Sequence, residues 1–201
     1  MEKSKKIELI AKLRKETGAG IGLCKEALEK SDWDYERALK YVSIKLQEKG
    51  ASKSAKAAHS GIIQTYVHGT DKKIGVMLEL TCQTDFVART DDFQYLAKEL
   101  ALQIAAMNPL YISEEDIPES ELQAVREQFL NDESLKGKPD NIKEKIVEGR
   151  IKKWKKQVVL EDQEYFRDDS MTVRQLIDKY VGKLGETIRL ARFARWVVGQ
   201  S

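Results

Sequence analysis

The sequence predicts an α+β protein in which three short helices precede a small antiparallel sheet covered by helices. Two changes in hydrophobic period support this fold class. Apolar residues recur at helical spacing until strict alternation begins at Gly61. Helical patterns then return, and a last alternating stretch closes the chain. Adjacent strands followed by helices and a returning strand are typical of one small sheet with helices packed on it.

The first segment is predicted to contain three helices. The first has an apolar stripe at Ile7, Ile10 and Leu13. Gly18 ends this helix, a second covers 21–28, and Ser31-Asp32 is the start signal of a third, which Gly50 closes. The apolar positions of the third helix are Trp33, Tyr35, Ala38, Leu39, Val42 and Leu46. Such a small core is marginally stable alone, and modules of this size usually present an apolar patch to a partner.

The stretch KGASKSAKAAHS that follows is small, polar and basic, which is typical of a linker. We therefore expect a three-helix module over 1–50, a linker over 51–60 and an α+β core over 61–201.

The core should begin with a β-hairpin. One strand alternates from Gly61, and a turn at 68–71 precedes a second strand. In the second strand one face carries Ile74, Val76, Leu78 and Leu80. Two strands joined by a short glycine-containing turn form an antiparallel hairpin. The closing stretch ETIRLARFARWVV predicts a final strand, and a bulge is one explanation for its slipped phase.

Helical patterns fill the space between these strands. Helices are expected over 91–107, 118–135 and about 140–158, then a polar loop over 161–171 and a helix capped by Thr172. The core-facing residues should be Phe93, Leu96, Leu100, Ile104 and Met107 in the first of these helices, and Ile142, Ile146, Trp154 and Val158 in the third.

Composition narrows the function classes. The net charge is +2, from 35 basic and 33 acidic side chains, so we expect no direct nucleic-acid partner. Cys24 and Cys82 lie far apart and suggest neither a disulfide framework nor a zinc site, which fits reduced thiols in the cytoplasm. The chain lacks a signal-peptide pattern and any run of about 20 apolar residues. We expect a soluble, cytoplasmic protein without a membrane partner.

The sequence contains no strong motif for catalysis or for binding of a nucleotide, a metal ion or RNA. The stretch GAGIG over 18–22 resembles a phosphate-binding loop, but a helix precedes it and no G-K-[ST] follows, so a tight turn between helices is favoured. His59 and His68 flank one strand without further metal ligands. Lysines around Trp154 could form an RNA stripe, but a solvated helix face is favoured because the overall charge is balanced. We expect no catalytic residue, metal or cofactor, and therefore no enzyme.

The stretch TDFVAR over 84–89 allows two interpretations. One unbroken helix to residue 107 would make Phe86 an ordinary core residue. Alternatively, Thr90 followed by two acids is a good N-cap, so that 84–89 forms a separate turn and Phe86 is free to project. The residues alone leave both interpretations open.

Three separated motifs resemble the elongation factor Ts family, the nucleotide exchange factors of elongation factor Tu in bacterial and organellar translation. The motifs are R-x-x-TGAG with CKEAL over 14–28, CQTDFVAR over 82–89 and GKP-x-x-I-x-EKIVEGRIKKW over 137–154. SMTVRQLI and the closing RFARWVVG add to the resemblance, which covers nearly the whole chain.

The resemblance implies that the first module is ubiquitin-associated-like and that the chain promotes guanine nucleotide exchange through protein–protein contacts. In this family the TDFV turn acts as a wedge, formed here by Thr84, Asp85, Phe86 and Val87. Phe86 would enter an apolar pocket between helices of the partner's GTPase domain, and Asp85 would bond at the same helix ends. Elements around the magnesium ion and phosphates would be displaced, so that GDP leaves and GTP rebinds.

The resemblance also implies contacts with elongation factor Tu at Arg14, Ile21, Gly22 and Lys25, and at His68 with another partner domain. Many members have a large apolar residue where this chain has Gly22, which has no side chain to insert. Longer members carry a second copy of the sheet unit, whereas one copy here resembles short members that form homodimers. The competing functions are a non-exchanging protein-binding module and an RNA-binding factor.

Overall fold

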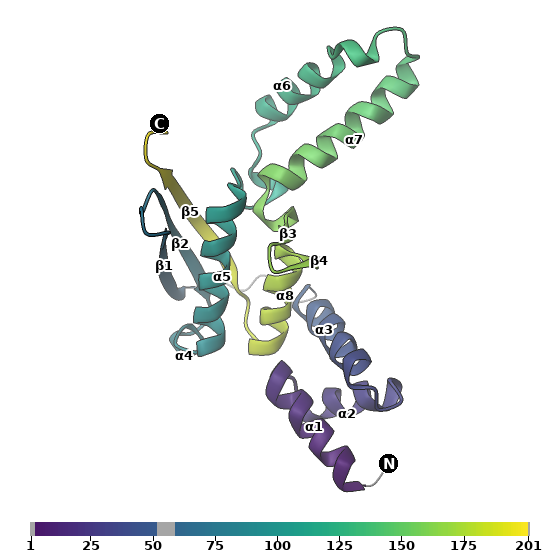
Figure 1. The fold of residues 1–201 in the computed structure, drawn as a ribbon, viewed down its shortest axis with the longest axis vertical. Helices are drawn as coiled ribbons and strands as arrows, with labels where there is room; N and C mark the ends of the chain where they lie inside the picture. The colour runs from purple at the N-terminus through teal and green to yellow at the C-terminus, as the bar shows by residue number, and fades with distance from the viewer. Residues whose placement is uncertain (1–2, 52–58, 201) are drawn as a thin grey trace. The chain divides into compact units, whose positions relative to one another are not determined.

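A computed structural model describes residues 3–51 and 59–200 of the chain. It confirms the α+β fold class, with three N-terminal helices followed by antiparallel strands and further helices (Figure 1). The helices and strands are α1 (Lys3–Thr17), α2 (Ile21–Lys30), α3 (Tyr35–Ala51), β1 (Ser60–His68), β2 (Ile74–Cys82), α4 (Asp85–Ala88), α5 (Asp91–Met107), α6 (Glu119–Leu130), α7 (Asp140–Val158), β3 (Glu164–Tyr165), β4 (Asp168–Thr172), α8 (Val173–Leu184) and β5 (Arg189–Val197). Short 3-10 turns are η1 (Glu114–Asp116), η2 (Glu133–Leu135) and η3 (Leu160–Asp162).

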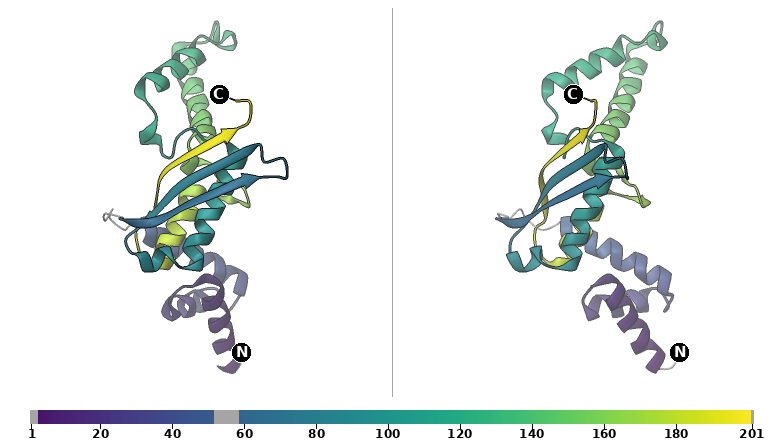
Figure 2. Two further views of the ribbon diagram at one scale, coloured as in Figure 1. Left: turned by 90° about the vertical axis from the view of Figure 1, so that its left-hand side faces the viewer. Right: turned by 60° about the vertical axis from the view of Figure 1, so that its left-hand side comes forward.

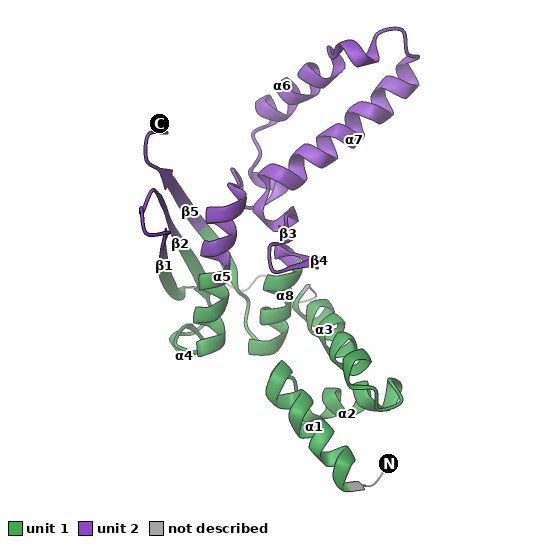
Figure 3. Ribbon diagram, viewed as in Figure 1, with its two compact units in different colours: residues 1–64, 78–98, 175–191 green, residues 65–77, 99–174, 192–201 purple. Residues whose placement is uncertain are grey.

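The chain divides into two compact units, which Figure 3 shows in different colours. The first unit comprises residues 1–64, 78–98 and 175–191, and the second comprises 65–77, 99–174 and 192–201. Of the predicted linker, residues 52–58 lie outside the described residues.

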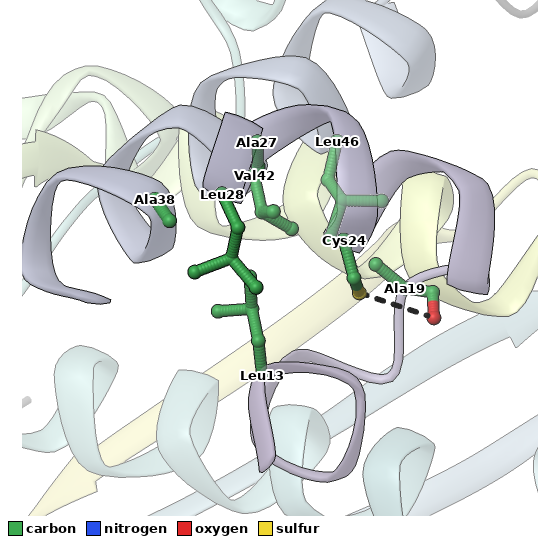
Figure 4. Close-up of a cluster of buried hydrophobic side chains, with 8 residues drawn as sticks. All are labelled: Leu13, Ala19, Cys24, Ala27, Leu28, Ala38, Val42 and Leu46. Carbon is green, nitrogen blue, oxygen red and sulfur yellow. Dashed lines mark hydrogen bonds between the residues drawn. The ribbon is translucent and has the colours of Figure 1, made fainter. Parts of the chain in front are cut away.

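The three N-terminal helices enclose a core of their own. Its buried residues, drawn in Figure 4, are Leu13, Ala19, Cys24, Ala27, Leu28, Ala38, Val42 and Leu46. Gly18 ends α1 with a φ of 66°, a left-handed conformation that glycine adopts without steric cost. Its N–H donates to the Arg14 carbonyl at 2.8 Å. The glycine-rich stretch is therefore a tight turn between helices, as the sequence favoured.

The third helix begins later than predicted. A start at Ser31-Asp32 is wrong, because Asp34 supplies the capping carboxylate, whose Oδ1 accepts a backbone N–H of the first turn at 2.8 Å. Asp32 and Trp33 have φ angles of 54° and 65°, which cannot continue into a right-handed helix. The Trp33 N–H donates to the Leu28 carbonyl at 2.7 Å, so these residues close α2 instead.

The main sheet has the strand order β1-β2-β5, so β2 is central. Residues 69–73 join β1 to β2 as the predicted hairpin. The β2–β5 pair is antiparallel, since the Thr81 hydroxyl donates to the Arg189 carbonyl while the Val198 N–H donates to the Lys73 carbonyl. The predicted inner face of β2 is confirmed, since Val76, Leu78 and Leu80 are buried and Ile74 is half-buried. Figure 2 shows the strands of the sheet from two further directions.

Helices α5 and α7 have the predicted bounds. In α7 the predicted inner residues Ile146, Trp154 and Val158 are only half-buried, and the buried residue is Val147, which was not predicted. In α5 the fully buried residues are Phe93, Leu96, Leu100 and Ile104. Met107 and Ile142 are wrong as core residues, because they are 46% and 44% exposed. Each lies in a terminal turn of its helix, where fewer neighbouring elements cover the surface.

Two further predictions need correction. The helix expected over 118–135 ends at Leu130, because Asp132 starts a separate 3-10 turn by accepting the Ser134 N–H at 2.8 Å. The polar loop expected over 161–171 contains the β3–β4 hairpin. Buried Gln103 of α5 supports this hairpin, since its Oε1 accepts the Phe166 N–H at 2.9 Å. Period alone cannot reveal such a distant polar partner.

No helix of the described residues is long and apolar enough to cross a membrane.

Candidate functional site

The TDFVAR stretch forms its own turn, which we name the wedge turn (residues 84–89). Thr84 has an extended backbone, and its Oγ1 accepts the Val87 N–H at 3.3 Å, so it is the N-cap of α4. Thr90 repeats the device for α5, with its Oγ1 accepting the Phe93 N–H at 3.3 Å. Two successive caps therefore separate α4 from α5. The structure decides between the two sequence interpretations in favour of the separate turn.

Phe86 projects from this turn into solvent. Its side chain is 79% exposed, whereas Phe93 in the next helix is fully buried. Within α4, Ala88 is 5% exposed and anchors the turn, while Val87 is half-buried. Phe86 thus contributes little to this chain's own core, and its aromatic surface is available to a partner.

Asp85 is paired within the turn. Its Oδ2 lies 3.0 Å from a guanidinium nitrogen of Arg89, and both side chains are largely exposed. An exposed pair of this kind contributes little to stability, because water and salt screen the charges. The Asp85 carboxylate can therefore exchange this partner for donors on another protein at small free-energy cost.

Glu186 holds the start of the wedge turn. Its Oε2 accepts the backbone N–H groups of Gln83 at 3.1 Å and Thr84 at 3.0 Å, and its Oε1 accepts the Thr84 hydroxyl at 2.6 Å. The Cys82 thiol adds a bond to the Thr84 carbonyl at 3.1 Å. Sequence reasoning missed Glu186, because it lies in the short connection between α8 and β5 and no local pattern distinguishes it from other surface acids.

A second ionic contact lies on the far side of the turn. Lys183, in the last turn of α8, places its Nζ 2.7 Å from Oδ1 of Asp92. Asp92 belongs to the first turn of α5, where a carboxylate is also favoured by the helix dipole. The end of α8 and the residues just after it therefore contact the chain before and after Phe86.

The four candidate residues of the first module surround the turn between α1 and α2. Ile21 is 63% exposed in the first turn of α2, and Lys25 follows one turn later on the same helix face. Arg14 is exposed at the end of α1, and its charge acts on the Cys24 thiol of α2. Gly22 is exposed, and a Cβ added there would meet no atom within 4 Å. This surface therefore has an open position at Gly22.

His68 lies at the end of β1 in the second unit. Its Nδ1 is 2.8 Å from the Tyr66 hydroxyl, and the two rings are 5.9 Å apart at their centroids. The imidazole is exposed and is oriented by a neighbour on its own strand.

The lysines around Trp154 coat a helix surface. Trp154 is half-buried, while Lys152, Lys153 and Lys156 are exposed. Lys155 is engaged with Glu114. This arrangement favours a solvated face over a stacking platform for RNA. Within residues 3–51 and 59–200, no group of three or more His, Cys, Asp and Glu side chains could hold a metal ion.

Comparisons with known proteins point to one family. The family model described as Elongation factor TS matches residues 12–200. The chain is 45% identical over 196 residues to an elongation factor Ts of Coprothermobacter proteolyticus, with 96% of this chain and 97% of the relative covered. It is 45% identical over 194 residues to that of Thermotoga neapolitana, with 96% and 97% covered. For Petrotoga mobilis the identity is 42% over 194 residues, with 96% and 98% covered.

Proposed function

The chain belongs to the elongation factor Ts family, the nucleotide exchange factors of elongation factor Tu, and we propose that its wedge turn promotes GDP release. Phe86 enters an apolar pocket of the partner's GTPase domain, and Asp85 bonds beside it. Thr84 and Val87 shape the turn that presents both side chains. The observation that carries this assignment is the 79% exposure of Phe86 on a turn with its own N-cap.

Exchange of this kind needs no catalytic residue. A factor that binds nucleotide-free partner more tightly than GDP-bound partner must weaken GDP binding by the same factor. Magnesium in nucleotide sites demands strict octahedral geometry and bridges phosphates to protein oxygens. A small displacement of the elements around the ion therefore loosens GDP, after which GTP can rebind.

The wedge turn must keep its shape while it displaces structural elements of the partner protein. The Thr84 cap fixes the start of α4, the buried Ala88 anchors its end, and Thr90 starts the next helix. A side chain presented on such a turn loses little conformational entropy on binding. An aromatic anchor of this kind can cost about 2 kcal/mol or more when truncated.

The first module supplies a second contact with the partner. Arg14, Ile21 and Lys25 offer one apolar and two basic side chains around the α1–α2 turn, and Gly22 contributes backbone only. His68 contacts a separate domain of the partner. These contacts add binding energy but displace nothing at the nucleotide, so their loss should weaken binding more than it slows release from the complex.

The test is release of fluorescent GDP from elongation factor Tu in the presence of magnesium. Phe86→Ala should keep the thermal unfolding of the free protein and slow stimulated release by about 30-fold, the equivalent of about 2 kcal/mol. Phe166→Ala is a matched control, because Phe166 is a 40% exposed aromatic outside the wedge turn. Release by Phe86→Ala at the wild-type rate, with binding verified, would remove Phe86 from this role.

We also propose that the protein forms a homodimer through the open face of its sheet. In the second unit this face carries large exposed apolar side chains on three strands or their ends, namely Val67, Met77, Trp196 and Val198. Met77 follows the buried Val76 in β2, so its side chain points to the other face of the sheet. Trp196 follows Arg195 in β5. The Arg195 guanidinium donates to the Ala105 carbonyl of α5, so the Trp196 side chain points to the face away from that helix. A second copy would cover these side chains.

Light scattering tests the dimer. Met77→Glu should give a monomer at concentrations where the wild type is dimeric, because a charge would be buried in the interface. Ile142→Glu is the matched control and should leave the dimer intact, because Ile142 is as exposed as Met77, at 44%, but lies in α7 outside the sheet. A wild-type protein that is monomeric at high concentration would refute the dimer and leave the wedge proposal untouched.

A further inference from the structure

We infer that Glu186 is a positioning residue for nucleotide exchange, which holds the wedge turn in its active geometry without touching the partner. The inference rests on the proposed role of Phe86 and extends it to a residue outside the TDFV motif. Glu186 is separated from the turn by about a hundred residues of sequence, yet it accepts three hydrogen bonds from residues 83 and 84.

The three bonds define the direction in which α4 leaves the sheet. Both Oε2 contacts come from consecutive backbone N–H groups, at 3.1 and 3.0 Å, so they orient the peptide plane that precedes the helix. The Oε1 contact aims the Thr84 hydroxyl, whose oxygen must also accept the Val87 N–H. One carboxylate therefore sets both the backbone and the capping side chain.

The wedge turn needs such support because α4 is only four residues long. A helix of one turn is not stable in isolation, since nucleation fixes several dihedral angles for a single hydrogen bond. The cap and the distant carboxylate supply what local propensity cannot. Without them, Phe86 would sample many directions, and the partner would have to order the turn on binding.

Lys183 supports the other end. Its Nζ is 2.7 Å from Oδ1 of Asp92, two residues after the Thr90 cap. Lys183 in the last turn of α8 and Glu186 just after that helix act on the chain after and before Phe86, respectively. The family resemblance implies no partner contact for either residue. Both act here on this chain's own backbone and side chains.

Three variants test the inference in the fluorescent GDP release assay with elongation factor Tu. Glu186→Ala should slow stimulated release by at least about tenfold, since a displacement of about 1 Å can cost on the order of 100-fold in positioned reactions. Glu186→Gln should stay within about twofold of wild type. Its amide oxygen still accepts both backbone N–H groups, and its NH2 can donate to Thr84. In a Phe86→Ala background, Glu186→Ala should have little further effect.

Amide hydrogen exchange of the free protein gives a readout that is independent of the partner. Glu186→Ala should deprotect the amides of Gln83, Thr84 and Val87 while amides in the centre of α5 keep their protection. Glu186→Gln should preserve all of these protections.

Each unexpected result would reject a different proposal. If Phe86→Ala exchanges normally, the wedge proposal fails first. If Phe86→Ala is slow but Glu186→Ala is normal, the positioning role fails alone. Additivity with Phe86→Ala would mean that Glu186 acts independently of Phe86, and equal loss in Glu186→Ala and Glu186→Gln would mean that the charge is required rather than the hydrogen-bond geometry. Either result overturns the inference. Loss of protection throughout α5 would mean that Glu186 supports the fold as a whole, which also overturns the inference.

Discussion

Gly182 of α8 lies directly against the backbone of Leu46 in α3: a Cβ added to Gly182 would stand 2.2 Å from the Leu46 carbonyl oxygen. The same interface repeats one turn further on, where a Cβ on Gly50 would stand 2.1 Å from the Asp178 carbonyl oxygen. Both contacts lie within the first compact unit. Two glycines thus allow the third helix of the N-terminal module to approach α8 more closely than any side chain would permit.

The first prediction concerns this close approach. Gly182→Ala should destabilise the protein by about 1–3 kcal/mol, because the methyl group overlaps a backbone oxygen that cannot move without shifting α3. Gly149→Ala in α7 is the matched control, since a Cβ there meets nothing within 4 Å. The control should be neutral or stabilising by up to about 1 kcal/mol. Urea unfolding of both variants measures the difference, and equal stabilities would show that the α3–α8 contact is loose.

The second prediction concerns the two thiols. Burial raises the pKa of both Cys24 and Cys82 above their ordinary value of 9.0, and the charge of Glu186 adds to the effect on Cys82. At pH 8 the native protein should therefore react slowly with a thiol reagent, and both thiols should react rapidly in urea. Rapid reaction of either thiol in the native state would contradict its burial.

The same shifts predict how stability depends on pH. A raised pKa in the folded state means that folding holds the thiol protons more tightly than unfolding does. This contribution is fully present below pH 9.0, the ordinary thiol pKa, and is lost as the pH rises through the higher folded values. Replacing both cysteines by alanine should flatten the alkaline side of the stability profile.

The third prediction concerns Asp132, between α6 and α7. The Ser134 hydroxyl and N–H, together with the Arg150 guanidinium, lower the pKa of Asp132 from 3.8 to about 2. Its contribution is therefore present above pH 3.8 and lost as the pH falls through about 2. The Ser134 amide signal in NMR should titrate with a midpoint near this lower value. A midpoint near 3.8 would show that the Ser134 hydrogen bonds and the Arg150 contact are absent in solution.

Much of the fold could be predicted from hydrophobic periodicity and from the residues that start and stop helices and strands. The bounds of α5 and α7 are those predicted, and α5 buries the apolar stripe that its residue spacing displays. The errors lie where that logic ends. Met107 and Ile142 are apolar and in phase, yet they lie in terminal turns and stay exposed. The β3–β4 hairpin escaped prediction because polar partners such as Gln103 hold it in place.

The conformation of the wedge turn was likewise determined partly by local sequence and partly by tertiary contacts. Thr90 followed by two acids is a local signal, so the sequence by itself determined that a new helix could begin there. It could not decide whether residues 84–89 form a separate turn, because an unbroken helix would have satisfied the same apolar spacing. The tertiary structure decided this through Glu186, which binds two backbone N–H groups and one hydroxyl of residues 83 and 84. Those donors can be satisfied by a carboxylate only when the fold brings it there, and so the exposure of Phe86 depends on a residue that no local pattern could identify.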